Sequence, residues 1–277
     1  MNHNDTSSCR PRRALGRPTA LALLAAAALI GLTACAGSGD GSTASVSSDD
    51  HAKSEQGDQG EQPNAKLPKL LWMGDSIGEA EAPALGAALE AGGTSFTSMA
   101  AAGGGGVVGE IAKPTWDELP KKLKSAAPDV VAYQITTYDW GTPAEQRKDY
   151  ERLAKTVNDA GAELVLVTAP PFKIDDFYKP HEAQIKTAAK SAEDVAAEHP
   201  DKVHFLDASA LWGTDSSAKK AQRSKDGIHS CQQGSAAFAQ WLSTELGKLY
   251  AYTPAPADQW ATGSWTGDKV YGPLGCK

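Results

Sequence analysis

The alternation of short apolar runs with longer amphipathic stretches over residues 67–249 most constrains what this chain can fold into. Short runs of apolar and β-branched residues are typical of buried strands, whereas apolar residues spaced three and four apart are typical of helices. The pattern predicts strands over 67–73, 94–99, 129–135, 163–168 and 203–206. It predicts helices between and after these strands, over 79–91, 116–125, 142–158, 181–199 and 230–249.

Strands that are separated by helices of this length predict a specific architecture. Each helix is long enough to cross over between parallel strands, and such right-handed crossovers place helices on both faces of the sheet. We therefore expect an α/β fold, a three-layer sandwich with a mostly parallel, flavodoxin-like sheet. Ligands bind beyond the carboxyl ends of such strands, so the loops after Met73, Met99, Ile135 and Leu206 should gather near one edge.

Residues 1–34 have the layout of an export signal rather than of a folded helix. Four arginines precede the apolar run at 20–30, which is too short to span a membrane comfortably. The segment Leu32-Thr33-Ala34-Cys35 resembles the bacterial lipobox, whose cysteine becomes a diacylated N-terminus. We expect a lipoprotein held through Cys35 at the extracytoplasmic face of the cell membrane, with the membrane as a partner. The alternative is an ordinary secreted protein with a cysteine near its cleavage site.

The stretch that follows, residues 35–66, differs sharply in composition from the rest of the chain. It consists mostly of Ser, Gly, Asp, Glu and Gln, with almost no large apolar residue. Such a stretch buries too little apolar surface to offset the entropy of ordering, which predicts a disordered tether. Residues 67–277 are then expected to form one domain with a C-terminal tail, because their number suits a single core.

Charge and cysteine content narrow the expected partners and compartment. The net charge is −7, and loss of the leader would remove four arginines and one aspartate and make it more negative. An acidic protein repels phosphate backbones, so nucleic acid is not expected as a partner. Cys9 lies in the leader and Cys35 is the lipid site, which leaves Cys231 and Cys276. These two can form one disulfide in an oxidising compartment or remain free thiols.

A candidate nucleophile stands where the first predicted strand ends. In Gly74-Asp75-Ser76, the serine would be exposed at the sheet edge, beside backbone N–H groups at a helix start that can face developing negative charge. The same three residues also make an ordinary turn and helix cap. The motif therefore indicates a catalytic serine only together with a second element.

The second element is the pair Asp226 and His229, which precedes the last predicted helix. An aspartate three residues before a histidine can orient the imidazole and stabilise its protonated form. His229 could instead be a structural histidine or a metal ligand. Neither His181 nor His204 has helical ligand spacing with it, so we expect neither a metal nor a cofactor.

Together these motifs resemble the blocks of the SGNH (GDSL-like) hydrolase family. The first block is matched by Gly74-Asp75-Ser76 and the last by Asp226 and His229, and the resemblance covers residues 67–249. It implies a serine ester hydrolase with Ser76 as nucleophile, His229 as base and Asp226 as the residue that orients it. The catalytic triad would follow the chain order Ser, Asp, His.

The middle blocks of the family match less closely. Gly103 or Gly104 would supply the second-block oxyanion donor, alongside the N–H of Ser76. In the third block, Thr136 falls at the family's glycine and Tyr138 at its asparagine, so the asparagine is absent. The missing donor could be replaced by the Tyr138 hydroxyl or by a threonine, or two backbone donors could suffice.

The expected function is hydrolysis of acyl esters through an acyl-enzyme at the cell envelope. Acetyl esters are the foremost expected substrates. The substrate would be a small-molecule or glycan ester. The alternatives are an O-acyltransferase acting on envelope glycans and a non-catalytic lipoprotein that binds the envelope. Aromatic residues make up 7% of the chain and no long apolar segment resembles a lid, which argues against long-chain lipid substrates.

Overall fold

The computed structural model describes residues 68–276. The predicted leader at 1–34, the lipidation site Cys35 and the tether at 35–66 lie outside the described residues, so these interpretations stay predictions. Among residues 68–276, no helix is both long enough and apolar enough to span a membrane.

Five parallel strands form the single sheet of the described domain. They are β1 (Leu70–Met73), β2 (Phe96–Ser98), β3 (Val130–Gln134), β4 (Glu163–Val167) and β5 (Val203–Leu206). Their order in the sheet is β2-β1-β3-β4-β5, which confirms the expected flavodoxin-like arrangement. In this order the chain leaves β1 toward β2 on one side and later pairs β3 on the other. The switch point therefore lies at the carboxyl ends of β1 and β3.

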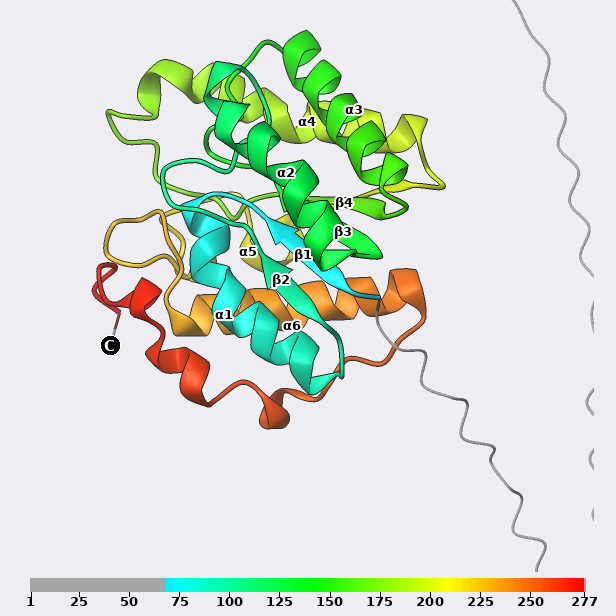
Figure 1. The fold of residues 1–277 in the computed structure, drawn as a ribbon. Helices are drawn as coiled ribbons and strands as arrows, with labels where there is room; N and C mark the ends of the chain where they lie inside the picture. The colour runs from blue at the N-terminus through cyan, green and yellow to red at the C-terminus, as the bar shows by residue number, and fades with distance from the viewer. Residues whose placement is uncertain (1–67, 277) are drawn as a thin grey trace, which may run out of the picture. The chain divides into compact units, whose positions relative to one another are not determined.

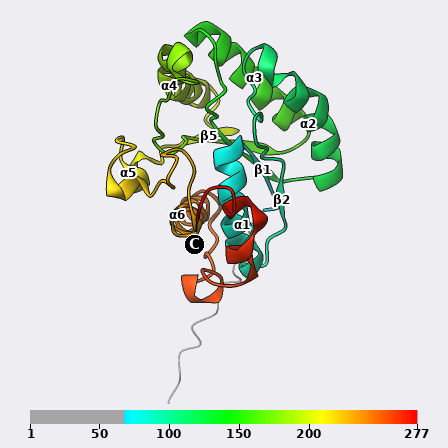
Figure 2. The same ribbon diagram turned by 90° about the vertical axis from the view of Figure 1, so that its left-hand side faces the viewer.

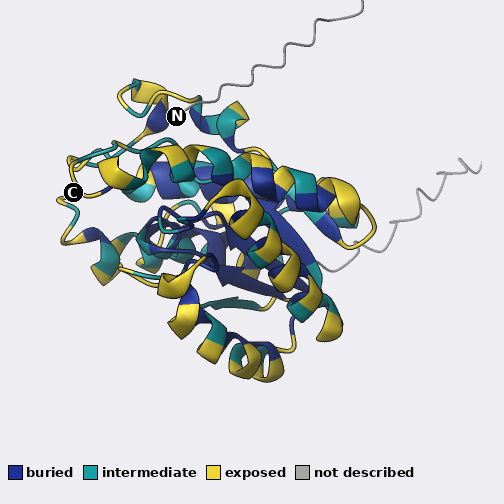
Figure 3. Ribbon diagram, turned by 90° about the horizontal axis from the view of Figure 1, so that it is seen from above, coloured by how far each residue is buried: buried dark blue, intermediate teal, exposed yellow. Residues whose placement is uncertain are grey.

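Helices cover both faces of the sheet, as Figures 1 and 3 show. One face carries α2 (Lys113–Ala126), α3 (Pro143–Asp159) and α4 (Glu182–Glu198), and the other carries α1 (Ser76–Ala91), α5 (Ser209–Trp212) and α6 (Gln232–Tyr250). The three-layer sandwich is thus confirmed.

The two cores follow from the alternation of side chains along each strand. On β1, Leu71 and Met73 face the α2–α3–α4 side, whereas Leu70 and Trp72 face the α1–α6 side. Both sets are buried, because a parallel sheet covered on both faces leaves no strand face to solvent. This is why the strands read as continuous apolar runs in the sequence.

Most helix boundaries fall close to the predicted ones, and local capping explains them. Helix α3 starts after Thr142, whose hydroxyl accepts from the N–H of Glu145 while the Glu145 carboxylate accepts from the N–H of Thr142. The first helix was expected at 79–91 but begins at Ser76. Asp75 is the reason, because its side chain accepts from the N–H of Ile77 and so caps the helix three residues earlier.

Beyond α6, the C-terminal tail packs back along α1 rather than extending the sheet. Figure 2 shows this red segment beside α1, and it contains three short 3₁₀ turns at Ala257–Gln259, Ser264–Gly267 and Lys269–Tyr271. A disulfide joins Cys276 to Cys231, which confirms the expected pairing. The tail and the start of α6 are therefore fixed to each other.

Candidate active site

The structure places Ser76 at the carboxyl end of β1, as the first residue of α1. At this position the N–H of Ser76 has no acceptor within the helix, because the first turn of a helix leaves its N–H groups without intrahelical partners. The Asp75 cap takes the N–H of Ile77 instead. Ser76 thus combines a partly exposed hydroxyl with a backbone donor at the positive end of a helix.

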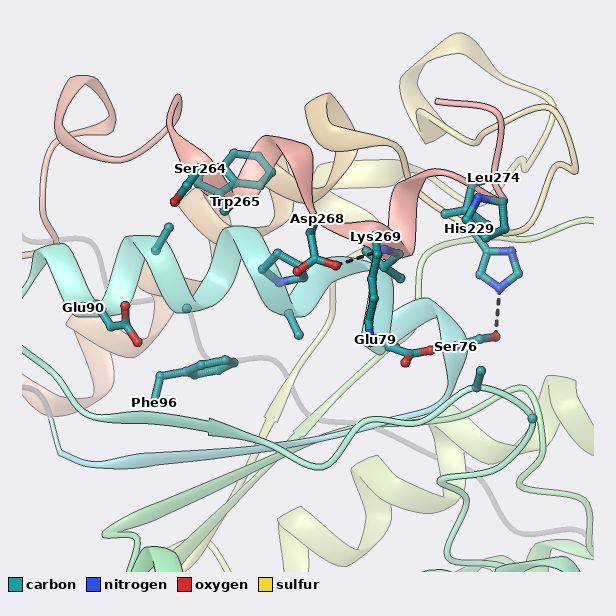
Figure 4. Close-up of a pocket in the computed structure, with 18 residues that line it drawn as sticks. Ser76, Glu79, Glu90, Phe96, His229, Ser264, Trp265, Asp268, Lys269 and Leu274 are labelled. Carbon is teal, nitrogen blue, oxygen red and sulfur yellow. Dashed lines mark hydrogen bonds between the residues drawn. The ribbon is translucent and has the colours of Figure 1, made fainter. Parts of the chain in front are cut away.

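His229 and Asp226 reach this serine from the loop before α6. The Nε2 atom of His229 lies 2.8 Å from Oγ of Ser76, and its Nδ1 atom lies 2.7 Å from Oδ2 of Asp226. The sequence-predicted trio is therefore brought into one hydrogen-bonded line (Figure 4 shows its Ser76–His229 link). A line of hydroxyl, imidazole and carboxylate is the arrangement that lets an imidazole take a proton from a serine.

The electrostatics of Asp226 suit the role of holding the imidazole. Burial raises the pKa of its carboxyl, but hydrogen bonds from His229, Ile228 and Ser224 outweigh burial and lower the pKa to about 2. Asp226 is consequently a carboxylate at neutral pH. Its second oxygen accepts from Ser224 and from the N–H groups of Ile228 and His229, which fixes its orientation.

Asp75, next to the candidate nucleophile, holds the loop after β3 in place. Its Oδ2 atom accepts from both the N–H and the hydroxyl of Thr137, each at 2.7 Å. Burial raises the pKa of Asp75 above its ordinary value, although the hydrogen bonds from Thr137 and Ile77 oppose the rise. The Thr137 hydroxyl is thereby engaged at Asp75.

The structure distinguishes the four glycines of the run at 103–106 by what lies around each of them. Gly103 lines the same cavity as Ser76 and His229, whereas Gly104 does not line it. Two glycines of the run have a positive φ, Gly103 at +72° and Gly105 at +84°, and at Gly105 a Cβ would also collide with the backbone of Gly74. Sequence reasoning missed Gly105, because four consecutive glycines give no signal to choose among them.

Tyr138, the residue aligned with the absent asparagine, is not among the residues that line the cavity that contains Ser76. Its ring packs against those of Trp140, Phe177 and Tyr178. Burial raises the pKa of Tyr138 above its ordinary value. Its ring is therefore held within an aromatic cluster.

Asp139, which sequence reasoning did not single out, joins the loop after β3 to the glycine segment. This buried carboxylate accepts from the N–H groups of Val107 and Thr136 and from the hydroxyls of Tyr133 and Tyr150. Burial raises the pKa of Asp139 despite these hydrogen bonds. The hydrogen bonds to Val107, Tyr133 and Tyr150 join segments far apart in the chain, so no local sequence signal indicated this role.

A second group that the sequence analysis did not single out is a buried carboxyl on α1. Glu81 is fully buried and accepts from Nε2 of Gln134 at 2.7 Å. Burial raises its pKa to about 8, although the charge of Arg223 opposes the rise. Arg223 in turn donates to the carbonyl of Ile228, the residue before His229. The hydrogen bond from Arg223 thus supports the loop that carries the imidazole.

The candidate trio opens into a cavity of about 1090 Å³. Ser76 and His229 lie at one end, and the cavity continues along α1 toward Glu90 and Phe96 beneath the C-terminal tail (Figure 4). Over residues 68–276, no group of three or more His, Cys, Asp or Glu side chains is arranged to hold a metal ion.

Comparisons with known proteins found likeness at the level of structure alone. A scan against models of protein families and a search of curated proteins gave no match. A solved structure described as a "putative acylhydrolase" from Bacteroides fragilis is similar over 73% of this chain and 100% of its own, with a TM-score of 0.51 and 15% identity.

Two further solved structures are similar at a TM-score of 0.48. One is a GDSL-like lipase from Bacteroides thetaiotaomicron, with 15% identity over 68% of this chain and 92% of its own. The other is a catalytic mutant of an acetylxylan esterase from Geobacillus stearothermophilus, with 16% identity over 65% of this chain and 94% of its own. The likeness to the acylhydrolase shows that the described domain shares the α/β fold of that structure.

Proposed function

We propose that this protein is a serine ester hydrolase that works through an acyl-enzyme. The observation that supports it most strongly is the 2.8 Å contact between Nε2 of His229 and Oγ of Ser76, with Asp226 behind the imidazole. A serine is a weak nucleophile by itself, and an adjacent base that is oriented by a third group is what activates it.

The reaction proceeds in two halves. His229 takes the hydroxyl proton as Oγ of Ser76 attacks the ester carbonyl, and it then gives that proton to the departing alcohol. Water next attacks the acyl-serine, with His229 again taking a proton, and the collapse releases the acid and restores the serine. Asp226 stays ionised throughout and stabilises the imidazolium that forms in each half.

The oxyanion is held by backbone donors in this proposal. The N–H of Ser76 is free of helical acceptors, and Gly103 lies on the wall of the same cavity. The Thr137 hydroxyl donates to Asp75, and Tyr138 is not among the residues that line the cavity. Two backbone donors therefore replace the side-chain donor that the absent asparagine would supply.

The setting proposed for this activity is the cell envelope. The lipobox-like Leu32-Thr33-Ala34-Cys35 and the polar stretch after it support a domain tethered to the extracytoplasmic face of the membrane. Acyl esters of envelope glycans and small esters are both within reach there, with acetyl esters as the smallest substrates. Metabolic labelling with an alkyne fatty acid tests the anchor: label is expected on the wild type and not on Cys35→Ser.

The decisive test of the enzymatic proposal is labelling by a serine-reactive fluorophosphonate. The full chain should be modified at Ser76, and both the label and the hydrolysis of an activated acetate ester should disappear in Ser76→Ala. A matched control is Ser98→Ala, which removes a hydroxyl from β2 outside the trio. An unlabelled, inactive wild type would favour the non-catalytic, envelope-binding interpretation instead.

A further inference from the structure

The cavity that begins at Ser76 is an elongated groove rather than a small pocket. Its floor follows one face of α1, where Ser76, Glu79, Pro83 and Glu90 succeed one another at helical spacing. Ser76 and Glu90 are fourteen positions apart on α1, which corresponds to about 21 Å along the helix axis. The groove is therefore far longer than an acetyl group needs.

The walls of this groove are mostly apolar. They consist of small or apolar side chains: Ala82, Pro83, Ala87, Phe96, Val270 and Leu274. These side chains offer neither donors nor acceptors to sugar hydroxyls. Four charged residues also line the groove: Glu90, Asp268 and Lys269 are exposed, and half-buried Glu79 lies one helical turn from Ser76. Such walls favour an aliphatic chain over a glycan.

The roof of the groove is held in place without any ligand. The tail that forms it is bonded at Cys276 to Cys231, two residues after His229. Tyr271 is buried and donates its hydroxyl to the carbonyl of Ala80 on α1. The groove is consequently preformed, so a chain that enters it loses little free energy to reordering of the protein.

We propose that this groove, termed here the α1–tail groove, binds the unbranched aliphatic acyl chain of the ester substrate. The carbonyl carbon sits at Ser76 and the chain runs along α1 under the tail toward Phe96, with room for about 16 carbons. The inference rests on the proposed function, because it assigns the substrate of the same serine. It departs from the sequence-based expectation that long-chain lipids are excluded.

Chain-length dependence tests the groove directly. The full chain carrying Cys35→Ser, which removes the predicted lipidation site and the need for detergent, is assayed on p-nitrophenyl esters from acetate to dodecanoate. Burying one methylene fully contributes about 0.8 kcal/mol, which corresponds to about a fourfold change in kcat/KM. A groove that is open to solvent should give part of this gain. We expect kcat/KM to rise about twofold per methylene up to at least decanoate.

Two tryptophan substitutions, placed at different distances from Ser76, test how far the acyl chain extends along the floor of the groove. Ala82→Trp stands six helical steps from Ser76, about 9 Å away, and Ala87→Trp stands eleven steps away, about 16 Å. Each should stop the rise of kcat/KM at a different acyl length, earlier for Ala82→Trp than for Ala87→Trp. Ala197→Trp, on the exposed face of α4, is the matched control and should follow the wild-type series.

The possible results separate the groove from the underlying function. Flat or falling kcat/KM with intact acetate hydrolysis overturns the groove assignment and leaves the esterase standing. The assignment is also overturned if kcat/KM rises with the length of the alkyl group in alkyl acetates but not with the length of the acyl group. The groove would then bind the alcohol part of the ester. No hydrolysis of any ester together with no fluorophosphonate labelling overturns both proposals. The chain-length series on the Cys35→Ser chain needs no tryptophan substitution, so a misfolded tryptophan variant does not weaken the test.

Discussion

Nε2 of His229 lies 2.8 Å from Oγ of Ser76, although 153 positions of the chain separate the two residues. The serine is held by the cap of α1 and the histidine by a loop tied to Asp226, to Arg223 and, through Cys231, to the tail. The contact is thus fixed from several sides, and each attachment can be tested separately.

Asp226→Asn should lower kcat on an activated ester by about 10²- to 10⁴-fold, since an amide can neither stabilise the imidazolium nor enforce its tautomer. Because the pKa of Asp226 is lowered to about 2, the loss should be similar from about pH 5 to pH 8. Ser224→Ala removes one hydrogen bond to the same carboxylate and should cost less than tenfold. Equal rates for Asp226→Asn and wild type would contradict the assignment.

Tyr138→Phe should leave kcat within about threefold of the wild type. Tyr138 packs among aromatic rings and does not line the cavity that contains Ser76, whereas losing a true oxyanion donor costs about 10²- to 10³-fold. Steady-state kinetics on p-nitrophenyl acetate separates these outcomes cleanly. A loss of a hundredfold would identify the tyrosine as the replacement for the absent asparagine.

Gly105→Ala should disrupt the loop beside Ser76, whereas Gly104→Ala should be tolerated. A Cβ at Gly105 meets the backbone of Gly74 and needs a left-handed conformation, but a Cβ at Gly104 meets nothing within 4 Å. Thermal unfolding and ester hydrolysis should both fall for the first variant alone. Matching behaviour of the two variants would mean that the loop can move to accept the side chain.

Glu81 should make the protein less stable as the pH rises. Burial raises its folded-state pKa to about 8, above the unfolded value of 4.5, so its contribution is complete below about pH 4.5 and is lost toward pH 8. The slope from this group is at most about 1.4 kcal/mol per pH unit. Urea unfolding at several pH values should show that Glu81→Gln lacks this component.

The exposed Glu90 of the same helix provides the control for that measurement. Glu90→Gln should retain the wild-type dependence of unfolding free energy on pH. A Glu81→Gln curve parallel to that of the wild type would mean that Glu81 does not hold its proton in the folded state.

Replacing both cysteines of the disulfide by serine should lower the free energy of unfolding by about 2–4 kcal/mol. The bridge closes a loop of 45 positions, and its loss frees the unfolded chain. Urea unfolding of the double variant beside oxidised and reduced wild type measures the effect. Coinciding midpoints for all three samples would show that the tail is held by its other contacts alone.

The sequence alone determined the strands, the helices and their parallel arrangement, because each depends on periodicity within a few neighbouring residues. It also indicated Ser76, Asp226 and His229 as a group, through two short motifs. Which glycine of the run at 103–106 cannot carry a side chain depended on a contact with the backbone of Gly74. The early start of α1 depended on the Asp75 cap. Periodicity reports neither.

Tertiary structure decided what surrounds the serine. The tail has no helical or strand periodicity, so nothing in it predicted that Trp265, Val270 and Leu274 would form a wall opposite α1. The Glu81–Arg223 network likewise joins positions far apart in the chain. Long-range packing and burial bring such residues together, and these depend on the whole folded chain rather than on any local pattern.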